Sequence, residues 1–380
     1  MKVRVLIVGA GPAGSACGIR LLQAGIECML IDRCKFPRVK LCAGLFTHKS
    51  QDCLCELLRE DRYNACMASS VMSRESDFSL YRQQQLLVTC QPSDPITLID
   101  RPQFDEWLVE HFISRGGRFH DGEELLDIDY ENKTAKMRSG ETITYDYLIA
   151  ADGANSTVER ILSRIFPISF QRKASSPLCL EINVDKTDLD MPGVNIFFDI
   201  VPHSYAWVFS KGEETCVGLV KLPGEKFDVN TAMRKFLSQL NLLNPQKYPL
   251  KGAMLPIGNY MNTPYWGNIL FVGDAAGLVE PLTGEGIYYA LQSGVYAAES
   301  IITAAPDPVG PLYEEKVRSL KSLIDKGAFY QRLLEKKWSN RLFLSQAHKH
   351  PNFICHFYDT QIEHACLDNF LKIVFKYKFK

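Results

Sequence analysis

Nearly continuous hydrophobic runs flank a segment of small residues at the start of the chain. Residues 2–8 are apolar almost without alternation, which is typical of a strand buried on both faces. A glycine-rich turn follows, and the small residues 13–24 predict a helix that ends at Gly25. A second apolar run, residues 27–31, is closed by Asp32. This strand–turn–helix–strand order predicts the opening half of a Rossmann-type α/β domain.

The pattern changes further along the chain. Residues 101–115 predict a helix with one apolar face, and residues 133–144 and 145–150 predict a hairpin or meander that returns to the first sheet. Strand-like runs then dominate, at 178–184, 194–201, 205–209 and 215–222. A buried strand at 268–272 precedes a helix over 284–304, and the residues after 307 are helical and cationic.

These elements predict an α/β protein in three parts. We expect a discontinuous Rossmann-type domain over 1–170 and 256–305. An inserted β-rich substrate domain should cover 171–255 and take in part of 45–95. A helical C-terminal cap should follow over 306–380.

Composition excludes several classes of protein. The 380 residues carry 43 Lys and Arg against 44 Asp and Glu, a net charge of −1, so binding of nucleic acid through bulk charge is not expected. Hydrophobic residues make up 46% and charged residues 23%, which excludes disorder, collagen and coiled coil. The 12 cysteines form no CxxC pair, so we expect reduced thiols and no disulfide framework. No apolar run reaches about 18 residues, so we expect a cytoplasmic protein with at most a peripheral membrane contact.

The glycine-rich turn has the spacing of a dinucleotide-binding motif. It is a GxGxxG sequence made by Gly9, Ala10, Gly11, Pro12, Ala13 and Gly14. Its glycines allow a tight turn, close approach to a pyrophosphate, and packing of helix on strand. The pyrophosphate would bind the free N–H groups of the helix N-terminus, and Asp32 would bind the adenosine ribose. NAD and FAD both use this arrangement.

Four further segments resemble FAD-dependent oxidoreductases of the aromatic-hydroxylase type. Residues 149–156 (IAADGANS), and residues 273–276 (GDAA) with Pro281, Gly284, Gly286 and Ile287, are similar to two of that family's motifs; the full wording of 273–291 (GDAAGLVEPLTGEGIYYAL) is also close to that of the geranylgeranyl reductase family. Residues 101–105 resemble its RxxFD segment, and Asp32 with Arg33 resembles its acid–Arg pair. One departure is Glu159, which stands where the family often has Arg, with Arg160 next. The resemblance implies that the first domain binds FAD non-covalently through Gly9, Gly11, Pro12, Ala13, Gly14, Asp32, Arg33, Arg101, Asp152, Gly273, Asp274, Pro281, Gly284, Glu285, Gly286 and Ile287.

Two other segments resemble the geranylgeranyl reductase family. Residues 36–44 (FPRVKLCAG) are similar to its FPRxKxCGGG loop, with Ala43 and Leu45 in place of glycines. Residues 202–212 (PHSYAWVFSKG) are similar to its PxxYxWxFPKG substrate segment, with Ser210 in place of proline. The resemblance implies that Cys42, Ala43 and Gly44 lie against the flavin and that Tyr205, Trp207 and Phe209 face the substrate. These three alternate residues would share one face of a strand.

The residues suit reduction of a carbon–carbon double bond, which needs a hydride from the flavin and a proton from a positioned acid. Cys42 can supply or relay that proton beside the cation of Lys40, or it is a structural or flavin-contacting thiol. The three aromatic residues make an apolar wall for a prenyl chain or a flat ring, or an ordinary core face. We expect an apolar, isoprenoid or quinone-like substrate. Because no second GxGxxG is present, NAD(P)H would bind only transiently, or another external reductant would serve.

Two other functions stay open. An aromatic hydroxylase or halogenase uses the same FAD cradle with O2, and residues 205–210 (YAWVFS) are loosely similar to the WxWxIP motif of flavin halogenases. A flavin-loaded electron carrier without catalysis is the non-enzyme alternative.

The C-terminal region holds two further patterns. Its metal-ligating residue types match no zinc-site spacing, so no metal is expected from His348, His350, Cys355, His356, His364 and Cys366. Residues 370–380 contain four Lys and four aromatic residues without an acid. Such a tail suits the surface of an anionic membrane, or it is a frayed end.

Overall fold

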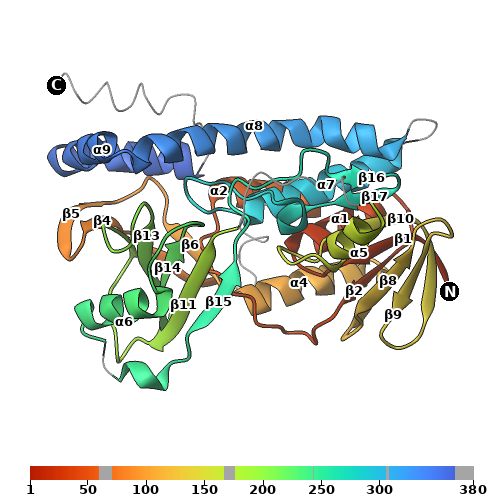
Figure 1. The fold of residues 1–380 in the computed structure, drawn as a ribbon, viewed down its shortest axis with the longest axis horizontal. Coiled ribbons are helices and arrows are strands. Elements are labelled where there is room, and N and C mark those ends of the chain that lie inside the picture. The colour runs from red at the N-terminus through yellow and green to blue at the C-terminus, as the bar shows by residue number, and fades with distance from the viewer. Residues whose placement is uncertain (60–70, 167–175, 243, 305–307, 364–380) are drawn as a thin grey trace.

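Figure 1 shows the fold of this computed structural model, in which residues 1–59, 71–166, 176–242, 244–304 and 308–363 are described. Within these residues the chain forms a mixed eight-stranded sheet, a mainly antiparallel seven-stranded sheet and a two-stranded ladder, with helices packed around them. The two large sheets lie at opposite ends of the view, and helix α8 runs along one side of both.

The first sheet is parallel at its centre. Its strand order is β16 (Tyr265–Trp266), β17 (Ile269–Phe271), β10 (Thr142–Ala150), β1 (Lys2–Val8), β2 (Cys28–Asp32) and β7 (Arg118–Asp121), and β9 (Thr134–Met137) joins β10 to β8 (Leu125–Asp129). Strand β1 pairs in parallel with both β2 and β10, and β10 pairs in parallel with β17. The carboxyl ends of these strands therefore meet at one edge, where ligands bind in sheets of this kind.

Helices cover this sheet closely. They are α1 (Pro12–Gln23), α2 (His48–Leu58), α4 (Arg101–Ser114), α5 (Thr157–Ile165) and α7 (Ile287–Thr303). Helix α1 packs between two others at glycine contacts. A Cβ atom on Gly294 of α7 would lie 2.2 Å from the carbonyl oxygen of Ala13, and one on Gly18 would lie 2.6 Å from the ring of Phe112 in α4. Only glycine permits such short distances between helices.

The second sheet brings together distant parts of the sequence. Its order is β15 (Lys251–Met254), β11 (Leu178–Asp185), β14 (Glu214–Lys221), β13 (Tyr205–Lys211), β12 (Val194–Phe198), β4 (Phe78–Arg82) and β5 (Gln85–Cys90). Strand β4 pairs in parallel with β12, so a segment from the range 45–95 extends this sheet. Helix α6 (Val229–Gln239) packs on one face through Met233 and Phe236. Strands β3 (Val71–Glu75) and β6 (Ile96–Ile99) form the two-stranded ladder.

The C-terminal helices join the two ends of the molecule. They are α8 (Val309–Glu335), α9 (Lys337–Lys349) and α10 (Pro351–Phe357), followed by a π-helical turn η3 (Tyr358–Glu363), while short 3-10 turns η1 (Pro245–Lys247) and η2 (Gly273–Ala276) occur earlier. On the first sheet, the buried hydroxyl of Tyr313 in α8 donates to the carbonyl oxygen of Phe271 at 2.6 Å. Over the second sheet, Phe343 of α9 and Phe357 of α10 belong to the same hydrophobic cluster as Trp207.

The expected α/β class, with a β-rich second part and C-terminal helices, is confirmed. Some element boundaries were wrong. Strand β10 continues through residues 144 and 145, where a break was expected. Helix α7 begins at Ile287 because Gly284 takes a left-handed backbone conformation, with φ of +75°. Strands β3–β5 were not predicted, because residues 71–90 are polar and of mixed pattern; β4 and β5 form a hairpin, β3 pairs with β6, and β4 also pairs with the distant β12.

Two expectations concern the C-terminal region. No helix among the described residues is both long and apolar enough to cross a membrane. His364, Cys366 and the Lys-rich tail at 370–380 lie outside the described residues.

The packing of α1 against α7 gives a stability prediction. Gly294→Ala should lower the stability by about 1–3 kcal/mol, because the added methyl group would overlap the carbonyl oxygen of Ala13. An exposed control on α8, Ser322→Ala, should leave the melting temperature close to that of the unaltered protein. Thermal unfolding followed by circular dichroism measures both. An unchanged or raised melting temperature for Gly294→Ala would show that the helices tolerate the extra methyl group.

Candidate functional site

A cavity of about 580 Å³ lies where the two sheets and the C-terminal helices meet. It begins at the glycine turn after β1, passes the loop 38–45, and ends in an apolar chamber walled by β13, α9 and α10. Of the predicted site residues, most line this cavity: Gly9, Gly11, Pro12, Ala13, Asp32, Arg33, Lys40, Cys42, Ala43, Gly44, Arg101, Asp152, Tyr205, Trp207, Phe209, Asp274, Gly284, Glu285, Gly286 and Ile287. Gly14, Gly273 and Pro281 are absent from its lining.

The glycine turn lies directly against the end of β10. A Cβ atom on Gly9, whose φ is +105°, would stand 2.2 Å from the carbonyl oxygen of Ala151, and one on Gly14 would stand 1.9 Å from the carbonyl oxygen of Gly9. Gly14 therefore acts by packing, behind the cavity wall. At Gly11 the guanidinium of Arg38 is the one group among the described residues near such a Cβ atom, at 3.3 Å. The N-terminus of α1 thus faces the cavity, where its free N–H groups can bind an anion.

Asp32 closes the turn from the end of β2. Its carboxylate accepts hydrogen bonds from the backbone N–H of Ala10 at 3.0 Å and of Cys34 at 2.9 Å. The guanidinium of Arg38 lies 3.3 Å from the same carboxylate. Asp32 is buried, lines the cavity and is fixed by main-chain donors, so its position does not depend on flexible side chains.

Two arginines share one completely buried acid, Asp105 of α4. Arg101 donates to both carboxylate oxygens at 3.0 Å, and Arg38 lies 3.1 Å from one of them. The side chain of Cys42 also interacts electrostatically with Arg101. Burial alone would lower the pKa of the Arg101 guanidinium, but Asp105 and Cys42 outweigh burial and raise it. Arg38 and Asp105 were not predicted as site residues, although both stand inside the quoted motifs.

The second motif forms the opposite wall. Lys40 lies 3.5 Å from the carboxylate of Asp274, so the two predicted residues make an ion pair. Glu285, just before α7, accepts hydrogen bonds from Thr47 at 2.5 Å and Ser50 at 3.2 Å, and it pairs with Lys49. These contacts tie the start of α2 to the start of α7. Sequence reasoning missed the residues at the start of α2.

Asp152 carries an unused acceptor at the cavity. One carboxylate oxygen accepts hydrogen bonds from the N–H groups of Thr157 at 2.7 Å and Val158 at 3.1 Å, at the first turn of α5. The other, Oδ1, is buried and has no hydrogen-bond partner among the described residues. Burial raises the pKa of this carboxyl, although Ser156, Val158 and Thr157 act in the opposite direction. A hydrogen-bond donor on a bound ligand would satisfy Oδ1.

The Cys42 loop, residues 36–44, lies between the two sheets. The Cys42 sulfur accepts a hydrogen bond from the N–H of Gly44 at 3.4 Å. The backbone of Cys42 contacts two buried charged residues of the second sheet, Glu181 and Lys211, neither of which was predicted as a site residue.

Tyr205, Trp207 and Phe209 point from β13 into the cavity, as the alternation of a strand requires. Phe343 and Phe357 of the C-terminal helices line the same chamber. The hydroxyl of Tyr205 donates to the carbonyl oxygen of Thr283 at 2.9 Å, beside Gly284. The chamber is therefore apolar at its far end and meets the polar motifs at its near end.

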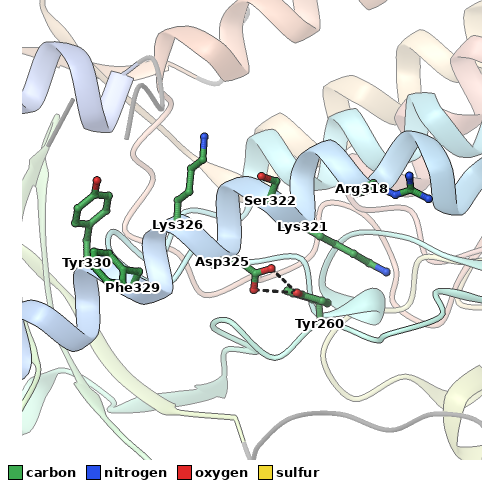
Figure 2. A pocket seen from close by; sticks show the side chains of 8 residues that line it. All are labelled: Tyr260, Arg318, Lys321, Ser322, Asp325, Lys326, Phe329 and Tyr330. Carbon is green, nitrogen blue, oxygen red and sulfur yellow. Dashed lines mark hydrogen bonds between the residues drawn. The ribbon is translucent and has the colours of Figure 1, made fainter. Parts of the chain in front are cut away.

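A second hollow lies along α8 and shares no lining residue with the cavity (Figure 2). Figure 2 shows the hydroxyl of Tyr260 donating to the carboxylate of Asp325, at 2.8 and 2.9 Å from its two oxygens. Lys321 reaches the carbonyl oxygen of Asn262 at 2.6 Å. These contacts attach α8 to the segment before β16, and none of the predicted site residues takes part.

The model of the family described as FAD binding domain matches residues 2–210. An uncharacterized protein of Methanosarcina barkeri is 32% identical over 305 residues, covering 79% of this chain and 74% of its own. The menaquinone reductase of Mycolicibacterium smegmatis is 28% identical (78% and 76% covered), and the geranylgeranyl diphosphate reductase of Rhodobacter capsulatus is 28% identical (79% and 75% covered).

Solved structures share the fold. A geranylgeranyl bacteriochlorophyll reductase-like protein of Thermoplasma acidophilum superposes with a TM-score of 0.79 at 19% identity, covering 99% of this chain and 98% of its own. The p-nitrophenol 4-monooxygenase of Pseudomonas putida gives a TM-score of 0.72 at 16% identity, with 98% of both chains covered.

The residues of the cavity fit FAD. The open N-terminus of α1 suits a pyrophosphate, and Asp32 lies where a ribose is bound in such folds. The unpartnered Oδ1 of Asp152 supplies a further buried acceptor. The cavity then continues past Cys42 toward the aromatic chamber.

Asp274 gives a direct test of cofactor retention. Asp274→Ala should raise the dissociation constant for FAD about tenfold, because one charged hydrogen-bond acceptor is lost from the cavity wall. Lys40→Met is the matched control, since it frees Asp274 from its ion pair but leaves the acceptor in place. Titration of the cofactor-free protein, followed by flavin fluorescence, measures both constants. Equal affinity in the Asp274→Ala and unaltered proteins would remove Asp274 from the cofactor site.

Proposed function

This chain belongs to the FAD-binding-domain family of FAD-dependent oxidoreductases, and on that premise we propose that it reduces a carbon–carbon double bond of an apolar, isoprenoid or quinone-like substrate. The observation that carries the proposal is one continuous cavity. It joins the dinucleotide-binding turn to the Cys42 loop and then to a chamber walled by Trp207, Phe209 and Phe343. The relatives named as reductases of geranylgeranyl diphosphate and menaquinone act on molecules of this prenylated kind.

Different residues of the chain would have different roles in the reaction. FAD supplies the hydride when it is bound and reduced. The aromatic chamber removes the apolar substrate from water and aligns it along β13. Cys42 donates the proton to the second carbon, and Lys40 stands close by in its ion pair with Asp274. Tyr205 closes the near end of the chamber through its hydrogen bond to Thr283.

Electrons come from outside the chain in this proposal. NAD(P)H binding transiently, or another two-electron donor, would reduce the flavin before each turnover, because the sequence contains no second GxGxxG. The substrate class is one that dissolves in bilayers, and the Lys-rich, aromatic tail at 370–380 suits contact with an anionic membrane surface.

Dependence on oxygen separates the proposal from its alternative, a hydroxylase or halogenase. That alternative shares the fold, as the p-nitrophenol monooxygenase shows. We expect product to form without O2 when the FAD-loaded protein receives dithionite and an unsaturated prenyl substrate, because hydride and proton transfer consume no oxygen. Mass spectrometry should find two added hydrogen atoms per reduced bond. Product that forms only in air, with added oxygen or halogen, would replace the proposal with the alternative.

Cys42→Ser tests the proton donor. A hydroxyl is a much weaker acid than a thiol at nearly the same size, so turnover should fall by about 10²–10⁴-fold. The FAD content, read from the flavin absorbance after desalting, should stay the same. Lys40→Ala should reduce turnover less, because it removes only a neighbouring charge. Full turnover in the Cys42→Ser protein would show that the proton comes from another group.

A further inference from the structure

Two buried charged side chains hold the peptide of Cys42 from opposite sides. The backbone N–H of Cys42 donates to the carboxylate of Glu181 on β11 at 3.1 Å. The ammonium group of Lys211, the last residue of β13, donates to the carbonyl oxygen of Cys42 at 3.5 Å. Glu181 is 6% exposed and Lys211 is 3% exposed. Both peptide groups of one loop residue are therefore bound by charges of the second sheet.

Burial of this pair is unfavourable unless the charges are compensated. Removing a carboxylate and an ammonium group from water costs several kcal/mol for each ion, of the order expected for buried pairs. The compensation here includes the Cys42 peptide, which presents its donor to Glu181 and its acceptor to Lys211. Hydrogen bonds to charged groups are stronger than those between neutral groups. The loop is thus fixed more firmly than backbone contacts alone would fix it.

Gly44 of the loop leaves space for the side chain of Lys211 beside Cys42. A Cβ atom on Gly44 would lie 3.2 Å from the Cε and Nζ atoms of Lys211 and 2.4 Å from the carbonyl oxygen of Ile99. Gly44 also has φ of +92°. A larger residue at this position would displace the lysine from the Cys42 carbonyl group, so Gly44 and Lys211 fit each other.

Several ionisable groups surround Glu181. Lys211 of β13, Lys251 of β15 and Lys40 of the loop lower the pKa of its carboxyl, as does the N–H of Cys42. The thiols of Cys179 on its own strand and Cys216 on β14 also face it. Burial is the larger effect, and the pKa of Glu181 is raised.

Resting on the proposed function, we propose that Glu181 and Lys211 are positioning residues that aim the Cys42 thiol at the substrate. They act through the main chain of Cys42, while the N–H of Gly44 donates to its sulfur. The pair also couples the loop to the substrate sheet, because Glu181 and Lys211 lie on strands that flank β14. Glu181 lines the cavity beside Cys42, whereas Lys211 is absent from its lining.

The test measures the mobility of the loop independently of turnover. Hydrogen–deuterium exchange of the peptide 39–46 reports the Cys42 amide, in protein with and without FAD. In Glu181→Ala that amide should exchange about tenfold faster or more, because its charged acceptor is gone. Glu181→Gln keeps an oxygen acceptor and should restore most of the protection. Lys251→Met is the control, because it removes the cation opposite Glu181 on β15 and leaves Glu181 and Lys211 in place beside Cys42.

A second variant serves in case Glu181→Ala fails to fold. Glu181→Gln combined with Lys211→Met removes both charges and leaves no unpaired ion in the interior. It should fold, bind FAD and retain its KM, but its kcat should fall about tenfold or more because the thiol is no longer aimed. In the unaltered protein, protection of the Cys42 amide, corrected for the intrinsic exchange rate, should weaken as pH falls through the pKa of Glu181. That dependence should be absent in Glu181→Gln.

The outcomes separate this inference from the proposed function. Unchanged exchange in Glu181→Ala, compared with the Lys251→Met control, overturns the inference, whatever the enzyme reduces. Faster exchange with unchanged kcat also overturns it, because the pair would then hold the loop without aiming a reacting group. Loss of kcat with faster exchange and intact FAD supports it. Failure of Cys42→Ser to lower turnover counts against the proposed function, and the exchange result can still be interpreted independently of it.

Discussion

The contact between the glycine turn and the end of β10 is the constraint on which the rest of the structure depends. At Gly9 and Gly14 there is no space for a side chain, since a Cβ atom would stand 2.2 Å from Ala151 and 1.9 Å from Gly9. This close approach sets the position of α1, whose N-terminus opens into the cavity. Helix α1 in turn positions α7 through the contact of Gly294 with Ala13. The start of α7, with Gly284 and Gly286, then forms the facing wall. One steric condition therefore places both sides of the cofactor site.

Interactions of buried charged side chains position the parts of the site that close packing does not. The loop 36–44 has no regular secondary structure, yet it lies between the two sheets. Arg38 attaches it to Asp32 and Asp105 of the first domain. Glu181 and Lys211 attach it to the second sheet. Such pairs are specific because each charge that loses its partner is left in a poorly solvated interior. The loop that carries the proposed proton donor is consequently fixed from both sides.

The sequence predicted the parts of this site whose signal is local. The glycine turn, Asp32 and the two later motifs are contiguous patterns, and the structure brings nearly all of those residues to one cavity. Alternation along residues 205–209 correctly placed Tyr205, Trp207 and Phe209 on one face. Gly14, Gly273 and Pro281 lie outside the cavity wall, since a motif does not distinguish contact from packing.

Residues that act across long sequence distances were not predicted. Glu181 stands 139 positions from Cys42, and its contact depends on the pairing of β11 with β14 and β15. One signal was available, because an acid at the centre of the apolar run LCLEINV is unusual in a buried strand. Strand β4 was missed for a related reason, since it extends the second sheet through a parallel pairing with β12. A sequence pattern predicts local periodicity, whereas these contacts are set by the topology of the sheets.

The central claim is that one cavity joins a cofactor site to an apolar substrate chamber at the Cys42 loop. A crystal structure of the protein with FAD and an unreactive, saturated prenyl analogue tests it most directly. The account predicts the pyrophosphate at the N-terminus of α1, the flavin ring beside the Cys42 loop, and the prenyl chain against Trp207, Phe209 and Phe343. A flavin ring turned away from Cys42, or a prenyl chain bound outside this chamber, would contradict the account.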